Sequence, residues 1–222
     1  MSEFSKLEYI WLDGYEPTQN MRSKTMIRKN FKGNLDECPM WSFDGSSTKQ
    51  ADGGDSDCLL KPVALYPDPQ RDNGFLVMCE VMNADGTPHV SNFRSKLKVL
   101  SDKCEDQDAW FGIEQEYTFM QNDYPFGWPK GGFPGAQGPF YCGVGSEKVY
   151  GRDIVEDHMD ACIMAGILIS GINAEVMPGQ WEFQIGPVGA PNIGDEIWIA
   201  RWLLYRIAED YNISATLTPK PV

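Results

Sequence analysis

One short segment constrains the fold more than any other part of the chain, because two strand-like runs meet at Pro178-Gly179. If these residues form a two-residue turn, the flanking runs alternate between an apolar face and a polar face, as in a hairpin that packs one side on a core. That register places Glu175 directly opposite Glu182. Pro-Gly favours a type II turn over the primed turns of tight hairpins, so a slipped register stays open. The apolar face holds Ala174, Val176, Trp181 and Phe183, and the polar face holds Asn173, Glu175, Glu182 and Gln184.

A second pair of carboxylates lies in the run 111–118, where Glu114 and Glu116 are two residues apart. On a strand, side chains at i and i+2 project from one face. Like charges held this close destabilise a sheet unless a cation neutralises them, and the hard cations Mg²⁺ and Mn²⁺ prefer oxygen ligands. The four glutamates therefore indicate a divalent-metal site. Solvated acidic strands are the alternative, because such residues are common on protein surfaces.

The order of the expected elements indicates an α+β fold. Period-two alternation predicts a strand-rich N-terminal domain, after which Ser91 is expected to cap a helix that ends near Cys104. Helices are also predicted over 153–166 and about 195–211. Strands are predicted at 7–12, 57–66, 75–82, 110–120, 167–176, 180–185 and from about 213.

The charge balance excludes several classes of partner. The net charge of −13 is the wrong sign for following a phosphate backbone or an anionic membrane, so no nucleic acid and no membrane partner is expected. The longest mostly apolar run, 161–172, is shorter than the roughly 20 residues that cross a bilayer, and the first ten residues do not resemble an export leader. Six cysteines without a Cys-x-x-Cys spacing predict free thiols in a cytoplasmic protein.

Two loops could carry further functional residues. The Gly/Pro-rich stretch 122–145 would allow the backbone to approach a nucleotide closely, or it is an ordered loop with irregular turns. Asp44 and the three hydroxyl residues that follow within 41–48 form an Asx or Ser/Thr turn on local grounds. His89 and His158 lack the spacing of a metal-ligand pair.

Taken together, five segments resemble glutamine synthetase of the type II form, and the resemblance covers essentially the whole chain. It implies an N-terminal β-grasp domain over 1–86 and the first half of a catalytic domain, an antiparallel sheet with helices, over 93–222. The implied reaction activates glutamate with ATP as γ-glutamyl phosphate, which ammonia attacks to give glutamine. The segments are WSFDGSST (41–48), DCLLKPVALYPDP (57–69), FGIEQEYT (111–118), GWPKGGFPGAQGPFYCGVG (127–145) and INAEVMPGQWEFQIGP (172–187).

The resemblance also implies residue roles. Glu116, Glu175 and Glu182 match three carboxylates of one Mg²⁺ or Mn²⁺ site, and Glu114 matches a ligand of a second site at the ATP phosphates. Asp44 resembles the acid that binds and deprotonates ammonium in the active site of a neighbouring subunit, which implies a homo-oligomeric ring, a decamer in the family. The implied nucleotide contacts are Glu114, Trp128, Glu182, Phe183, Gln184, Ile185, Gly186 and Pro187.

The chain departs from this family at its C-terminal end. The family continues past Val222 into a segment with a histidine, a glutamate and arginines that hold metal, glutamate and phosphates. The chain is therefore expected to be a truncated glutamate-ammonia ligase that is inactive by itself. One alternative is a non-catalytic paralogue that acts as an interaction protein. Another is a glycoside hydrolase that uses one glutamate of each pair as acid and base, without a metal.

Overall fold

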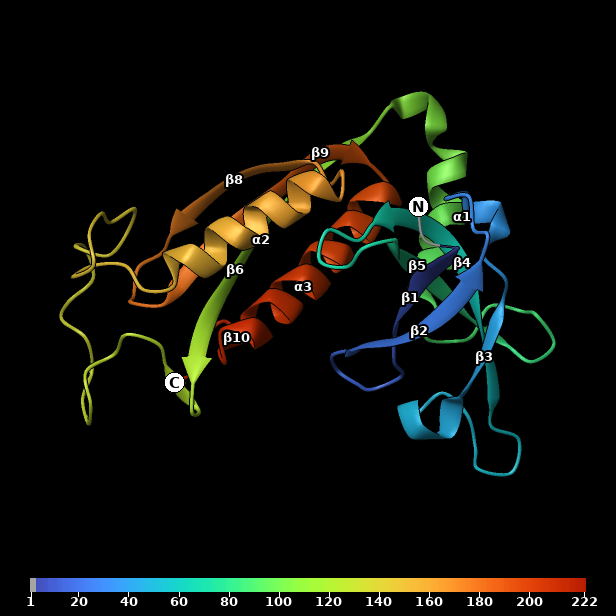
Figure 1. Cartoon of the computed structure of the whole chain (residues 1–222), viewed down its shortest axis with the longest axis horizontal. Coiled ribbons are helices and arrows are strands. Elements are labelled where there is room, and N and C mark those ends of the chain that lie inside the picture. The colour runs from blue at the N-terminus through green and yellow to red at the C-terminus, as the bar shows by residue number, and fades with distance from the viewer. Residues whose placement is uncertain (1–2) are drawn as a thin grey trace. The chain divides into compact units, whose positions relative to one another are not determined.

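The computed structural model describes residues 3–222, and these separate into two compact units (Figure 1). Unit 1 comprises the described residues up to Ala109 together with Met164–Gly166 and Ala190–Asp195. Unit 2 comprises Trp110–Ile163, Ile167–Gly189 and Glu196–Val222. Each unit contains one five-stranded sheet, and helices accompany both, so the expected α+β class is confirmed.

The sheet of unit 1 has the strand order β2-β1-β5-β4-β3. β1 and β5 are parallel, and the other neighbours are antiparallel. Alternate residues of β1, such as Leu7, Tyr9 and Trp11, are buried in one apolar core, as the period-two pattern predicts. The strands are β1 (Phe4–Leu12), β2 (Met21–Lys29), β3 (Trp41–Asp44), β4 (Asp57–Pro67) and β5 (Gly74–Asn83).

Helix α1 (Phe93–Lys103) follows this sheet, and it begins one step later than expected. The cap is Asn92, whose side chain accepts a hydrogen bond from the backbone N–H of Ser95 at 3.0 Å, so the prediction of a Ser91 cap was wrong. The Ser91 hydroxyl instead accepts a hydrogen bond from the Gln50 side chain at 2.9 Å. Both residue types cap helices well, but the Ser91 side chain is engaged by Gln50 and His89.

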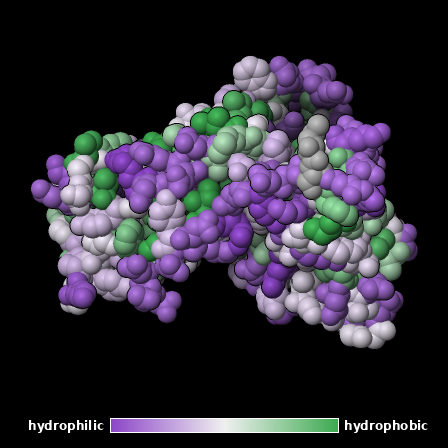
Figure 2. All heavy atoms as spheres, viewed as in Figure 1, coloured by the Kyte–Doolittle hydropathy of each residue, from purple (hydrophilic) through white to green (hydrophobic). Residues whose placement is uncertain are grey.

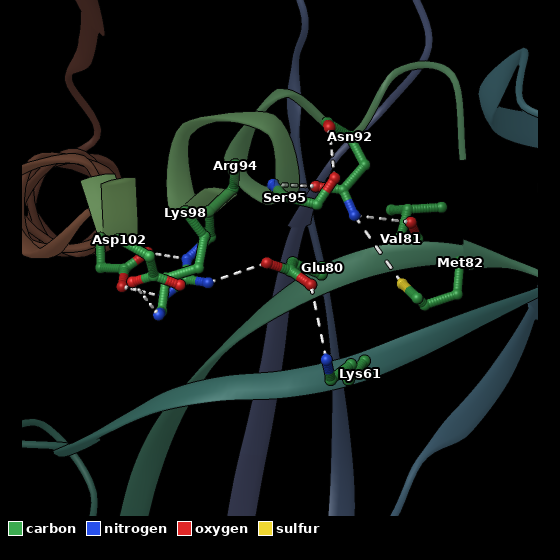
Figure 3. Close-up of polar contacts among 10 residues, drawn as sticks. Lys61, Glu80, Val81, Met82, Asn92, Arg94, Ser95, Lys98 and Asp102 are labelled. Atoms are coloured by element: carbon green, nitrogen blue, oxygen red, sulfur yellow. Dashed lines mark hydrogen bonds and ion pairs between the residues drawn. The ribbon is translucent and has the colours of Figure 1, made fainter. Parts of the chain in front are cut away.

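Arg94, in the first turn of α1, bonds to two acidic residues from other parts of unit 1. Its guanidinium binds both carboxylate oxygens of Asp195, at 2.7 and 2.8 Å, and Oε1 of Glu80 at 2.8 Å. Figure 3 shows Arg94 directed at Glu80 of β5, with Lys61 of β4 on the other side of that carboxylate. Both acids are buried, so one arginine neutralises two carboxylates that have little contact with water.

The sheet of unit 2 has the order β10-β6-β9-β8, with β7 paired to β6. Helices α2 and α3 cover its apolar face. His158 of α2 packs edge-on against Phe183 of β9, with ring centroids 5.0 Å apart, and its Nε2 lies 2.9 Å from the carbonyl oxygen of Ala200 in α3. The elements are β6 (Trp110–Gln121), β7 (Tyr124–Pro125), α2 (Arg152–Met164), β8 (Ile169–Ala174), β9 (Gln180–Gly189), α3 (Asn192–Asp210) and β10 (Ser214–Thr216).

The hairpin between β8 and β9 has the expected turn but a different register. The N–H of Gln180 donates to the carbonyl of Met177 at 3.1 Å, and Gly179 has φ +75°, as a type II turn requires. Two residues are inserted between this turn and the last paired residue of β8, so Asn173, not Glu175, lies opposite Glu182. The predicted pairing was wrong because the twist of a type II turn does not match that of the strands. The shift is even, and side chains therefore keep their faces.

Replacing Gly179 with alanine should destabilise the chain by about 1–3 kcal/mol. A Cβ atom there would lie 2.4 Å from the backbone oxygen of Phe126, and the φ of +75° is unfavourable for any other residue. Urea unfolding measures the change. Gly194→Ala is the matched control, because its Cβ would meet open space. Equal stability of the two variants would contradict the turn geometry.

The surface and the thiols agree with the composition. The face drawn in Figure 2 is mostly hydrophilic, with hydrophobic residues in small groups. No helix within residues 3–222 is long and apolar enough to cross a lipid bilayer. All six cysteines are free, as expected, and Cys142 is the exposed one.

Candidate metal centre

Three carboxylates converge on the face of the unit 2 sheet that the helices leave uncovered. Glu116 of β6 pairs directly with Glu182 of β9, and Glu175 follows the end of β8. One carboxylate oxygen from each lies within 4.8 Å of the others. Oxygens that share a divalent cation at roughly 2.0–2.6 Å lie within about 5 Å of one another, so this spacing suits a common ion. The expected convergence of the three glutamates is confirmed.

An amide side chain holds each of these carboxylates. Gln180 donates to Oε2 of Glu116 at 2.9 Å, and Asn173 donates to Oε1 of Glu175 at 3.0 Å. Gln184 donates to Oε1 of Glu182 and also to Oδ1 of Asn173, the latter at 2.8 Å. Gln180 was missed from the sequence, although its even position on β9 places it on the face of Glu182. These amides fix the carboxylates without adding charge.

The three carboxylates repel one another, and two of them are buried. Burial raises the pKa of Glu175, and the charges of Glu116 and Glu182 raise it further. Glu175 and Glu182 are only 7% and 9% exposed, whereas Glu116 is exposed. A bound cation would relieve this repulsion, so the donor set fits a hard divalent metal ion.

The raised pKa of Glu175 gives a pH-dependent prediction for the metal-free protein. The folded state binds this proton more tightly than the unfolded state, so stability falls as the pH rises from about 4.5 through the raised pKa. Glu175→Gln should therefore raise Tm at pH 7 when no divalent cation is present, by about 2–4 °C for each kcal/mol gained. Below about pH 4.5 the gain should vanish.

Differential scanning calorimetry in a chelating buffer measures these Tm values. The control is Glu156→Gln, on an exposed position of α2, which should change Tm little. A Tm for Glu175→Gln below that of the unmodified chain at pH 7 would show that the charge at this position is not destabilising.

Glu114 does not join this group but lines a neighbouring cavity of about 680 Å³. Glu114 of β6 lies directly opposite Gln184 of β9, and this pair is two residues further along the strands than the pair of Glu116 and Glu182. Gln184 therefore contacts the carboxylate group and also lines the cavity. The cavity is lined by Gly112, Ile113, Glu114, Ser170, Gln184, Ile185, Gly186 and Pro187.

Five of the eight expected nucleotide residues line this cavity, and the other three, Trp128, Glu182 and Phe183, do not. Glu182 belongs to the carboxylate group instead. Phe183 is fully buried and packs on His158 and Tyr117, so its side chain faces the core and only its backbone remains for a ligand. Trp128 packs on the rings of Tyr124 and Phe133 and is not among the cavity residues. Strand alternation alone places the Phe183 side chain on the other face of the sheet from Glu182 and Gln184.

Asp44 ends β3 in unit 1 and starts a short 3₁₀ turn. Its carboxylate accepts hydrogen bonds from the backbone N–H and the hydroxyl of Ser46, at 3.0 and 2.6 Å, and from the hydroxyl of Ser47 at 2.9 Å. The hydrogen bonds from Ser46, then Ser47, hold the pKa of Asp44 below its usual value. The local Asx turn is therefore present, and it keeps this exposed acid ionised at neutral pH.

Comparison with known proteins gives two family matches along the chain. The family described as "Glutamine synthetase, beta-Grasp domain" matches residues 3–84, and "Glutamine synthetase, catalytic domain" matches residues 94–222. A glutamine synthetase of Streptomyces viridochromogenes is 59% identical over 218 residues, which cover 98% of this chain and 64% of that protein. One of Schizosaccharomyces pombe is 54% identical, with coverage of 97% and 60%.

The solved structures show the same fold at lower identity. A Plasmodium falciparum glutamine synthetase superposes with a TM-score of 0.75 at 16% identity, over 99% of this chain and 48% of that one. The chain thus spans 60–64% of the length of the two curated relatives.

Proposed function

The chain belongs to the glutamine synthetase family, and from that premise we propose that the protein makes glutamine from glutamate, ammonia and ATP through a γ-glutamyl phosphate. The observation that carries the proposal is the convergence of Glu116, Glu175 and Glu182 beside a cavity of about 680 Å³. In this proposal the β-grasp domain covers 1–86 and the catalytic domain 93–222. Its substrates are glutamate, ammonium and ATP.

Mg²⁺ or Mn²⁺ is the proposed metal, because all donors are carboxylate oxygens. Glu116, Glu175 and Glu182 would hold one ion, and Glu114 would contribute to a second at the ATP phosphates. When bound, such an ion neutralises charge on phosphate oxygens. The amides of Gln180, Asn173 and Gln184 keep the carboxylates oriented toward their common space.

The cavity is proposed to receive the nucleotide. Its volume lies in the range of small-molecule sites, about 300–1,000 Å³. Gly112 and Gly186 leave its wall without side chains at two positions, so a ligand can approach the backbone. Glu182 and Gln184 would place the phosphates beside the carboxylates. Phe183 would contribute through its backbone, and Trp128 stays a proposed contact from the loop 122–145.

Asp44 is proposed to bind ammonium and to accept its proton. An ionised carboxylate attracts the cation, and ammonium must lose a proton to become a nucleophile. Asp44 would act in the active site of a neighbouring subunit, which makes the protein a homo-oligomeric ring, with the decamer of the family as the expected form. Six free cysteines fit a reducing compartment, and the cytoplasm is proposed.

The rival functions are less well supported. A glycoside hydrolase needs only two carboxyl groups and no metal, whereas three carboxylates here each direct an oxygen into one cation-sized space. A non-catalytic paralogue would not need to retain this arrangement, and relatives at 54–59% identity are named for the enzyme.

The proposed activity is tested by glutamine formation. Because the curated relatives are longer than this chain, the assay uses the product of the complete reading frame with glutamate, ammonium and Mg-ATP. We expect turnover on the order of 1 s⁻¹ or faster, lost in Glu182→Gln. ATP-dependent glutamine that persists in the variant, or none from the unmodified protein, would contradict the proposal.

A further inference from the structure

Arg201 of α3 is a partly buried cation whose partner is neutral. Its guanidinium donates from Nε at 2.8 Å, and also from Nη2, to the single acceptor Oε1 of Gln115. It also lies over the ring of Trp198, 4.4 Å from the centroid. No carboxylate among residues 3–222 forms an ion pair with it, and burial lowers the pKa of Arg201. Burying an unmatched charge costs free energy, so stability does not explain this arrangement.

Gln115 uses both ends of its side-chain amide. While Oε1 accepts from Arg201, Nε2 donates to the backbone carbonyl of Glu116 at 2.7 Å. A guanidinium has donors only, so Arg201 fixes which end of the amide faces it and leaves the NH₂ group for Glu116. A helix side chain is thereby connected, through one amide, to the backbone of a metal-centre residue.

The carbonyl of Glu116 lies on the open edge of β6. The N–H of Phe119 donates to the carbonyl of Gly179, toward β9, at 2.8 Å. Backbone groups alternate in direction along an antiparallel strand, so Glu116 directs its own groups away from β9. On that side β10 pairs only with Thr118 to Met120. Within the described residues, no strand supports the backbone where Glu116 lies.

We propose that Arg201 and Gln115 are positioning residues, which hold the open edge of β6 so that Glu116 keeps its place among the three carboxylates. The inference rests on the proposed function, because it takes those carboxylates to bind a divalent cation. Gln115 and Glu116 are neighbours on a strand, so their side chains lie on opposite faces. The hydrogen bonds from Arg201 to Gln115 and from Gln115 to Glu116 therefore restrain the metal centre from the face of the sheet that α3 covers, without contacting the ion.

Mn²⁺ binding, measured by electron paramagnetic resonance titration of the chain, tests this role. Gln115→Met removes both amide contacts and keeps a similar side-chain volume. We expect the Kd for Mn²⁺ to rise about tenfold, which is the lower end of the loss seen when a residue that holds a metal ligand in place is replaced. Gln115→Glu separates positioning from stability. Its carboxylate can pair with Arg201 but cannot donate to the carbonyl of Glu116.

For Gln115→Glu we therefore expect a Tm at or above that of the unmodified chain together with a Kd also raised about tenfold. The added negative charge would by itself strengthen cation binding, so weaker binding cannot come from charge. The control is Arg206→Met, which removes an exposed arginine of the same helix that pairs with Glu209 and should leave Kd unchanged.

The outcomes separate this inference from the function on which it rests. If the unmodified chain binds Mn²⁺ and Glu182→Gln does not, but both Gln115 variants bind within about threefold of the unmodified chain, the positioning role is wrong and the metal centre stands. If the unmodified chain does not bind Mn²⁺, or Glu182→Gln binds it equally well, the proposed metal centre itself is wrong.

Discussion

Glu182→Gln should weaken Mn²⁺ binding to the chain by a factor on the order of 100 or more. Glu182 is the central carboxylate of the group, because it pairs across the sheet with Glu116 and lies near Glu175. Glutamine keeps the size of the side chain but removes one of the three negative charges. Cation affinity at oxygen sites depends strongly on the number of charged ligands, so this loss exceeds that from any neighbouring amide.

Isothermal titration calorimetry with Mn²⁺ and with Mg²⁺ measures the effect. The matched control is Glu156→Gln, which removes the same charge from an exposed position on α2 and should leave both affinities unchanged. Similar losses in the two variants would show that the net charge of the protein, and not the carboxylate group, attracts the cation. An unchanged affinity in Glu182→Gln would mean that the ion binds elsewhere.

Arg94→Met should lower the free energy of unfolding by about 3–5 kcal/mol. The variant leaves Glu80 and Asp195, which are 6% and 3% exposed, without the guanidinium that binds both. Lys61 also pairs with Glu80, at 3.9 Å (Figure 3), but it forms no ion pair with Asp195 within residues 3–222. For a chain of this length the corresponding fall in Tm is on the order of 10 °C.

Thermal and urea unfolding measure this change, and Lys98→Met on the same helix is the control. Lys98 pairs with Asp102 at an exposed position, so its loss should cost less than about 1 kcal/mol. Adding Asp195→Asn to Arg94→Met should recover part of the stability, because one uncompensated carboxylate is then removed. An Arg94→Met variant as stable as the control would show that water reaches these acids.

The metal centre was predictable to a large extent, although one reason for it was wrong. Strand geometry paired Glu114 with Glu116 and Glu175 with Glu182, and the family resemblance grouped Glu116, Glu175 and Glu182 at one site. These three do converge. The pairing of Glu175 with Glu182 was wrong, since Asn173 takes that place. The prediction succeeded because a register shift of two leaves every side chain on its face. A shift of one would have turned Glu175 to the opposite face, toward α2 and α3.

Other contacts had no local signal. Arg94 meets Asp195 across 101 residues, and Arg201 meets Gln115 across 86. A cap at Ser91 was expected, but Asn92 caps the helix, while the Ser91 hydroxyl contacts Gln50, 41 residues away. Each of these contacts depends on elements that meet only after the chain has folded.

The sequence by itself determined the kinds of element, the face on which each strand residue lies and the carboxylates available for a metal. It could do so because the periods of two and 3.6 residues are local properties of the backbone. The tertiary structure alone decided the register beside Met177–Gln180, the cavity next to Glu114 and the contact of Arg201 with Gln115. Strand register, cavities and contacts between distant side chains arise when separate segments pack together, and no single segment determines how that packing turns out.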